Sequence, residues 1–302
     1  LYTRKHIVAL AWVLAASIGF YGVKGGLFTL ATGGSHRVWG PEGTYIGGNN
    51  EVALALVMII PLMQFLRLTT DKLWVKHGLL AAMLLCAVAA LGSQSRGALL
   101  AIGAMATVMW WRGRNRFWGG VFLVSIAAGL IAFMPDSWME RMQTIQTYEQ
   151  DDSALQRLNA WEMAWNIARS NVFGAGFMVA QPDVCALYSP IPTDCRAAHS
   201  IYFMVLGEHG FIGLFLFLLL WILVWRSAGY LRIEAAKQPD TRWLAPLGAM
   251  AQVSLAGYAV GGAFLSLAYY DLPYNILVLV VLGRRWMEGK AWREEAQHRH
   301  PT

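Results

Sequence analysis

The sequence predicts an all-α integral membrane protein: a polytopic bundle of about eight transmembrane helices with one long, partly helical outward loop. Three observations predict it. Of the 302 residues, 57% are hydrophobic and only 14% are charged, whereas a soluble domain carries about 25% charged residues. The mean hydropathy is +0.43. The 14 Trp residues point the same way, because Trp concentrates where hydrocarbon meets water.

The predicted spans are apolar runs that reach, or nearly reach, the ~20 residues needed to cross a bilayer as a helix. The runs 117–135 and 243–270 contain no charged residue and are the clearest. The run 97–111 is short, and the last span begins just after Tyr270. In chain order the predicted spans are 7–31, 51–68, 77–93, 97–111, 117–135, 201–225, 243–266 and 271–287.

The basic residues predict the orientation. Most of the 24 Lys and Arg residues lie at one set of helix ends, from Arg4 to Arg299 in the tail, and cytoplasmic loops are the ones enriched in these residues. Both termini are therefore expected in the cytoplasm. Because Leu1 is not Met and lies close to an apolar run, we expect residues 1–302 to be a single membrane domain that lacks earlier helices.

The net charge of +6 does not indicate nucleic-acid binding, because the basic residues are scattered in short clusters between apolar runs. Membrane lipids are the expected surroundings. The composition also excludes disordered, collagen-like, coiled-coil and disulfide-scaffold proteins.

Residues 136–200 form an outward loop, and a loop of this length is usually functional or disordered. Helical spacing predicts a helix over about 153–170. This amphipathic helix either lies in the membrane interface or covers the mouth of the bundle. Its apolar residues are Leu155, Leu158, Trp161, Trp165 and Ala168.

The three cysteines have different surroundings. Cys86 lies in an apolar run and is expected in the core. Cys185 and Cys195 both lie in the outward loop, ten residues apart. An oxidising periplasm would allow these two to form a disulfide; the alternative is two free thiols.

Charged side chains at membrane depth or at its outer rim are costly, so each is a functional candidate. Arg96 lies in a tight outward turn, and Arg37 in a Gly-rich outward loop. A guanidinium binds phosphate oxygens bidentately, although interfacial anchoring is the alternative for Arg96. Glu51 begins the next span, where it could complement the helix dipole.

His199 ends the long loop, and an imidazole is a natural general base at neutral pH, although a lone histidine is more often structural. Glu208 and His209 lie about three turns deeper, too far to act beside His199 unless the helix breaks at Gly207 or Gly210. The sequence contains no H-E-x-x-H and no C-x-x-C, so no metal site and no cofactor are expected.

Taken together, these segments resemble the O-antigen ligase/polymerase superfamily. The resemblance is carried by the Arg37 loop running into Asn49-Asn50-Glu51, by Ser95-Arg96-Gly97 and by His199-Ser200. It covers about residues 30–225. Two stretches, Met142–Trp161 and His199–Gly213, are more similar to one branch, the O-glycosylation ligases associated with the exosortase A system. Members usually have more spans than eight.

The resemblance implies a glycosyltransferase of the bacterial inner membrane with a periplasmic active site. The donor would be a glycan on undecaprenyl pyrophosphate, and the acceptor a hydroxyl of lipid A core, a protein or another glycan. His199 would deprotonate the acceptor. Arg37 and Arg96, with Arg196 as a third candidate, would hold the pyrophosphate, and one metal-free displacement would invert the anomeric carbon. Glu51, Glu208 and His209 are supporting candidates.

Two alternatives remain. A polymerase of the same superfamily would use the same residues with a different acceptor. A transporter for the lipid-linked glycan would need charges along a path and broken helices in paired halves. The second is disfavoured, because the charges cluster on one side and only Lys24, Glu208 and His209 are expected at membrane depth.

Overall fold

The computed structural model describes residues 3–112 and 152–290, with the isolated positions 120, 125, 128–129 and 132. These residues contain helices and no β-strand. The predicted span 117–135 and the first part of the outward loop, 136–151, lie outside the described residues apart from those positions.

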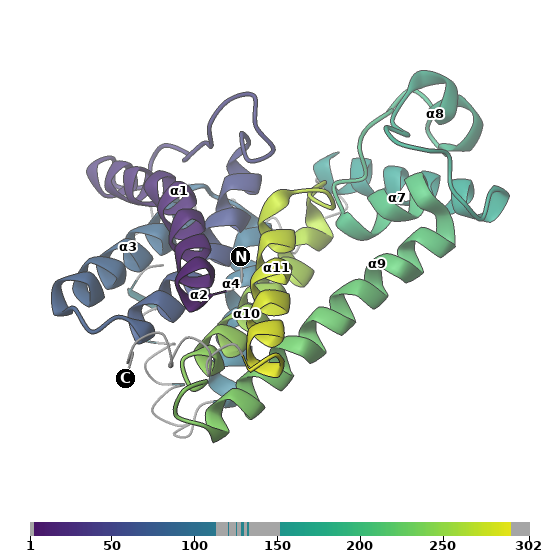
Figure 1. Ribbon diagram of the computed structural model, residues 1–302. Coiled ribbons are helices and arrows are strands. Elements are labelled where there is room, and N and C mark those ends of the chain that lie inside the picture. The colour runs from purple at the N-terminus through teal and green to yellow at the C-terminus, as the bar shows by residue number, and fades with distance from the viewer. Residues whose placement is uncertain are drawn as a thin grey trace.

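Every predicted span that falls on described residues is a helix, so the chain is an all-helical, multi-pass membrane protein (Figure 1). The helices are α1 Arg4–Ala31, α2 Asn49–Thr69, α3 Leu73–Gly92, α4 Arg96–Arg112, α7 Asp152–Ser170, α8 Pro182–Tyr188, α9 Ile201–Glu234, α10 Leu244–Gly261 and α11 Asp271–Glu288. The short 3₁₀ helices η2 (Ala235–Lys237) and η3 (Gly262–Phe264) extend α9 and α10.

Among the described helices, five are long and apolar enough to cross a membrane: α1, α2, α3, α9 with η2, and α10 with η3. The remaining two predicted spans fall short of that standard. Helix α4 is apolar but only 17 residues long. Helix α11 carries Asp271, Arg284, Arg285 and Glu288 in 18 residues, so its ends are too polar for hydrocarbon.

Helix α2 is the centre of the bundle. It packs against α1, α3, α4 and α10, and its residues from Val52 to Ile59 are fully buried. A helix that is apolar all round is stable only when it is surrounded in this way. Helices α1 and α3 approach closely, because a Cβ at Gly26 would collide with the carbonyl oxygen of Leu85. Small residues permit such contacts between membrane helices.

One end of the bundle is closed by aromatic rings and arginines. The Arg4 guanidinium lies 5.1 Å from the ring centroid of Trp243, and that ring packs edge-on against Trp286 at 5.3 Å. Phe65, near the end of α2, lies 6.4 Å from Trp243. These helix termini, which the basic residues assign to one side of the membrane, therefore lie together at one end of the bundle. That this side is cytoplasmic stays a prediction.

Residues 152–200, which we call the lobe, comprise α7, α8 and their connections. Helix α7 packs against α9, where Ala164 meets Gly207. Its buried residues Met163 and Ile167 instead form a small core of the lobe with Val179 and Cys185. The predicted apolar stripe packs in part: Ala168 is buried, and the rings of Trp161 and Trp165 contact Phe203 and Phe211 of α9. Leu155 and Leu158 are about half exposed. The contact between α7 and α9 is close because α9 presents Gly207 to Ala164. A Cβ at Gly207 would lie 3.3 Å from Cβ of Ala164.

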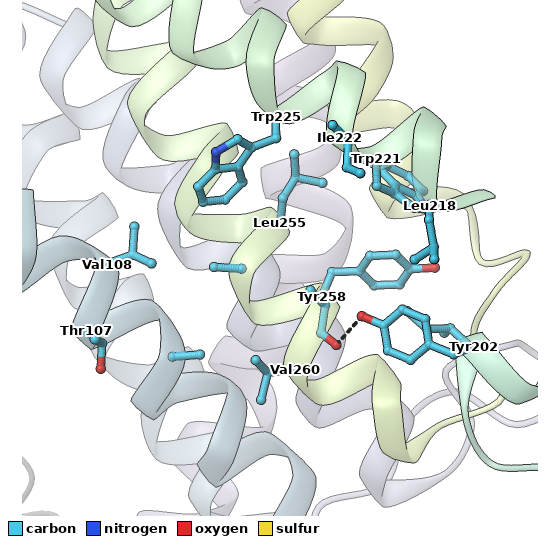
Figure 2. Close-up of a pocket in the computed structure, with 14 residues that line it drawn as sticks. Thr107, Val108, Tyr202, Leu218, Trp221, Ile222, Trp225, Leu255, Tyr258 and Val260 are labelled. Atoms are coloured by element: carbon cyan, nitrogen blue, oxygen red, sulfur yellow. Dashed lines mark hydrogen bonds between the residues drawn. The ribbon is translucent and has the colours of Figure 1, made fainter. Parts of the chain in front are cut away.

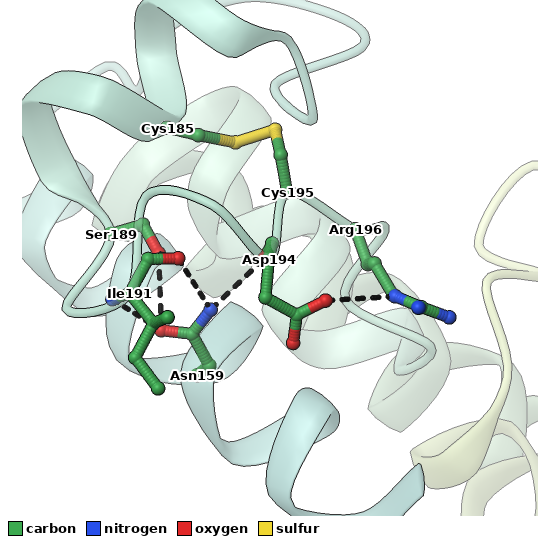
Figure 3. Close-up of a disulfide and its surroundings, with 7 residues drawn as sticks. All are labelled: Asn159, Cys185, Ser189, Ile191, Asp194, Cys195 and Arg196. Carbon is green, nitrogen blue, oxygen red and sulfur yellow. Dashed lines mark hydrogen bonds and ion pairs between the residues drawn. A yellow bond between two sulfur atoms is a disulfide. The ribbon is translucent and has the colours of Figure 1, made fainter. Parts of the chain in front are cut away.

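A disulfide joins Cys185 and Cys195, with their Cα atoms 5.7 Å apart (Figure 3). The loop between them is fixed to α7 by Asn159. Its Nδ2 donates to the carbonyl oxygens of Ile191 (3.3 Å) and Asp194 (3.0 Å), while its Oδ1 accepts from Ser189 Oγ and Ile191 N, each at 3.0 Å. Cys86 is free and buried between α1 and α3.

Alkylation of the denatured protein with a maleimide polymer should therefore add one label without reductant, at Cys86, and three labels after reduction. The Cys86→Ser variant is the control and should take none and two. Three labels on the unreduced wild type would contradict the pairing.

Removing the disulfide with Cys185→Ser should lower the free energy of unfolding of the lobe by about 2–4 kcal/mol.

Candidate active site

A tight turn between α3 and α4 fixes the position of Arg96. Gln94 has a φ of 56°, and the Asn49 side chain donates to the Ser93 carbonyl oxygen at 2.8 Å. Ser95 then caps α4, because its hydroxyl accepts from the backbone N–H of Ala98 at 3.2 Å. Arg96 is thus the first residue of α4, half-buried at the end of the bundle opposite Arg4 and Trp243.

The Gly-rich loop before α2 brings Arg37 to this same turn. Arg37 Nε donates to Gln94 Oε1 at 3.2 Å, and the backbone N–H of Val38 donates to the Gly92 carbonyl oxygen at 3.1 Å. Two predicted anion-binding side chains, separated by almost sixty residues in the sequence, therefore belong to one local assembly. Both are half-buried.

Glu51 lies in the first turn of α2, and its carboxylate folds back over Gly48, leaving no space for a side chain there. That is the position of a carboxylate that complements a helix N-terminus. Glu51 also acts on His199, because its negative charge raises the pKa of the imidazole. Glu51 therefore complements the start of α2 and also influences His199 electrostatically. The two roles expected from the sequence do not exclude each other.

His199 lies at the junction between the lobe and α9. Its φ of 45° is uncommon for a residue with a Cβ. Its backbone N–H donates to Ser266 Oγ at 3.0 Å. The preceding carbonyl oxygen, of Ala198, accepts from Trp161 Nε1 at 2.7 Å, and the Trp161 ring stacks on Phe203 with centroids 4.8 Å apart. The backbone of His199 is thus held from both the lobe and the bundle.

The surroundings lower the pKa of His199 below its ordinary value of 6.5. Burial is the largest cause, followed by the positive charge of Arg157; Glu51 opposes the effect, and Arg196 adds to it. The imidazole is therefore neutral at pH 7 and able to accept a proton. Arg157, on α7, is a member of this site that the sequence did not single out, because a charged residue on an amphipathic helix is usually solvated.

Arg196 is placed differently from Arg37 and Arg96. Its Nε forms an ion pair with Asp194 Oδ1 at 2.8 Å, and its side chain is 56% exposed (Figure 3). It influences His199 electrostatically, and its Nε is engaged by a carboxylate. Arg196 is thus more exposed than the half-buried Arg37 and Arg96.

Glu208 and His209 gather around Tyr269, which the sequence did not single out. The Tyr269 hydroxyl donates to Glu208 Oε2 and lies 2.9 Å from His209 Nε2. Helix α9 does break at Gly210, with a φ of 65° and a ψ of −164°. The break lies beyond Glu208 and His209, so the helical stretch that separates these two residues from His199 is regular.

An apolar cavity of about 600 Å³ lies between α4, α9 and α10 (Figure 2). Its α9 wall starts with Ile201 and Tyr202, which directly follow His199 and Ser200. On α4 the wall begins at Ala104, eight residues beyond Arg96 and therefore about 12 Å along that helix. The remaining wall contains Trp221 and Trp225. A charged site and an apolar cavity are thus adjacent, an arrangement that suits an amphiphile.

Within the described residues, no group of three or more His, Cys, Asp and Glu side chains is arranged to hold a metal ion.

Comparison with known proteins gives one family match. No curated protein sequence matches the chain. A family model described as O-Antigen ligase matches residues 81–218, which include Arg96, Arg157, Arg196, His199 and Glu208. Arg37, Ser266 and Tyr269 lie outside the matched range. From the second half of α3 to the middle of α9, the chain is therefore similar to the O-antigen ligases. This match supports the resemblance to the O-antigen ligase superfamily that the sequence indicated.

Proposed function

We propose that this protein transfers a glycan from undecaprenyl pyrophosphate to an acceptor hydroxyl at the outer leaflet of the bacterial inner membrane. The single observation that carries the proposal is the arrangement around His199. A histidine poised in its neutral form lies at the same end of the bundle as two half-buried arginines. The match to O-antigen ligases supports glycosyl transfer as the class of reaction.

The reaction is one displacement. His199 accepts the proton of the acceptor hydroxyl, and the acceptor oxygen forms a bond to the anomeric carbon of the donor. The bond from that carbon to the pyrophosphate oxygen breaks, which inverts the anomeric centre and releases undecaprenyl pyrophosphate. Arg37 and Arg96 neutralise the charge that develops on the leaving pyrophosphate. No metal is assigned to this step.

The lipid chain of the donor is proposed to occupy the apolar cavity. With the pyrophosphate at Arg96, the chain would run along α4 toward Ala104 and Val108, away from the aqueous face. The cavity volume is in the range of small-molecule sites. It therefore accommodates only the first isoprene units, while the remainder of the chain lies in the bilayer.

The acceptor separates the branches of the superfamily. A ligase transfers the glycan to lipid A core or to a protein, as in the branch associated with the exosortase A system, whereas a polymerase extends another lipid-linked glycan. The stretch His199–Gly213 favours the exosortase-associated branch. A transporter, the alternative outside enzymology, would move the glycan without forming a new glycosidic bond.

Purified protein given undecaprenyl-pyrophosphate glycan should glycosylate the acceptor, and His199→Ala should lower kcat about 10²- to 10⁴-fold, because general-base catalysis is lost. Arg37→Ala and Arg96→Ala should each lower kcat/KM about 10²- to 10³-fold. The matched control is His77→Ala, an exposed histidine near the start of α3, which should transfer at the wild-type rate. Product analysis distinguishes a ligase from a polymerase.

Transfer by His199→Ala at the wild-type rate would overturn the role of the base, and inhibition by a chelator would overturn the metal-free mechanism. Movement of the lipid-linked glycan without a new bond would favour the transporter.

The pH dependence of kcat/KM should show an acidic limb below pH 6.5, since His199 must lose its proton and its pKa is lowered. Replacing Arg157 by Gln removes a positive neighbour and should move this limb to higher pH. Glu51→Gln removes a negative neighbour and should move it to lower pH. Limbs that move together, or that do not move in either variant, would show that another group titrates.

Filling the cavity should affect long donors more than short ones. Ala104→Trp should lower kcat/KM for the undecaprenyl donor about 10- to 70-fold, because displacing a few methylene groups from an apolar site costs about 1.5–2.5 kcal/mol. A donor on a two-isoprene chain should react as with wild type. Ala106→Trp, on the same helix outside the cavity lining, is the control. Equal losses with both donors would exclude the cavity as the site of the chain.

A further inference from the structure

The break in α9 leaves two backbone carbonyl groups that the helix cannot satisfy. In an unbroken helix the carbonyl oxygens of Gly207 and Glu208 would accept from the N–H groups four residues later. Here they accept from the N–H groups of Ala175 and Gly176, each at 3.0 Å. Gly210 makes the break, since its backbone conformation is open to glycine almost alone.

Glu208 is the buried carboxylate at this break, 4% exposed. Its Oε1 accepts from the backbone N–H of Met178 at 3.0 Å, and its Oε2 accepts from the Tyr269 hydroxyl. Burial and the adjacent Glu208 raise the pKa of Tyr269, so the hydroxyl stays protonated and uses its single proton in the hydrogen bond that it donates to Glu208. The 2.9 Å contact with His209 Nε2 must then use a proton on that nitrogen.

Tyr269 belongs to a short segment, residues 265–270, that also carries Ser266. The segment is held on its other sides by tyrosine hydroxyls. Tyr258 of α10 donates to the Leu267 carbonyl oxygen at 3.1 Å, and Tyr274 of α11 donates to that of Ala268 at 2.7 Å. Tyr269 supplies the link to α9. Three residues before it, Ser266 accepts the backbone N–H of His199.

We propose that Ser266 and Tyr269 are positioning residues for His199. Tyr269, bound to Glu208 and His209, fixes segment 265–270 against α9, and Ser266 on that segment holds the His199 backbone in its left-handed conformation. The imidazole is thereby kept in one orientation toward the acceptor hydroxyl. This inference rests on the proposed function, because it assigns the two residues to the base of that reaction.

A positioning role predicts a loss in the chemical step and not in donor binding. Ser266→Ala and Tyr269→Phe should each lower kcat about 10- to 100-fold, since small misplacements of a catalytic group have effects of this size, with the donor KM changed less than twofold. Ser266→Thr keeps the acceptor oxygen and should restore at least half of the wild-type kcat.

Matched controls separate positioning from general loosening. Ser254→Ala removes a buried serine hydroxyl bond of 2.7 Å, to the Met58 carbonyl oxygen inside the bundle. Tyr274→Phe removes a tyrosine hydroxyl bond to the same segment and keeps the ring that packs against Trp221 of α9. Both should keep kcat within twofold of wild type. Equal losses in the controls, an unchanged kcat in Ser266→Ala and Tyr269→Phe, or no recovery with Ser266→Thr would overturn the proposal.

A second readout does not depend on transfer. The rate at which diethyl pyrocarbonate modifies His199, measured by peptide mass spectrometry, should change several-fold in Ser266→Ala and Tyr269→Phe and should be unchanged in the two controls. If the wild type transfers no glycan but this pattern is found, the proposed function fails and the positioning role stands. If transfer is found and the reactivity of His199 is the same in all variants, the positioning role fails.

Discussion

The structure depends on the rule that backbone polar groups near a membrane must find partners within the protein. Helix α9 departs from regular geometry at Gly210, and the exposed carbonyl groups are satisfied by the segment around Ala175 and Gly176. That segment is thereby tied to the helix, and with it the rest of the lobe. The break therefore determines where the lobe sits, and the lobe carries His199.

The site is assembled from short connections and not from helix interiors. The Arg37 loop, the turn before Arg96, the end of the lobe and segment 265–270 all meet where helices begin or end. Rigid helices set the distances between these connections, as scaffolds do for functional loops. The apolar cavity follows directly behind, between α4, α9 and α10. The charged side chains of the candidate site thus lie at one depth of the bundle. On α4, the apolar wall of the cavity begins about two helical turns beyond Arg96.

The sequence was sufficient for features that depend on composition along the chain. Apolar runs located the helices, and clusters of Lys and Arg identified ends that do lie together, as Arg4 and Trp243 show. Ser266, Tyr269 and Arg157 could not be found in this way, because their roles depend on partners tens of residues away. The predicted apolar stripe of α7 was correct for Trp161, Trp165 and Ala168 and wrong for Leu155 and Leu158, which are about half exposed. The close approach to Gly207 is made by the small side chain of Ala164, which hydrophobic size did not indicate.

The disulfide between Cys185 and Cys195 sets an order of events in biogenesis. The bundle needs no oxidation to form, since its one described thiol, Cys86, is buried and unpaired. The ring in the lobe closes only where thiols are oxidised, and Arg196 and His199 follow it directly. The bundle can therefore be complete while the approach to His199 is unfinished. With the lobe on the periplasmic side, as proposed, the ring closes only after this part of the chain has crossed the membrane.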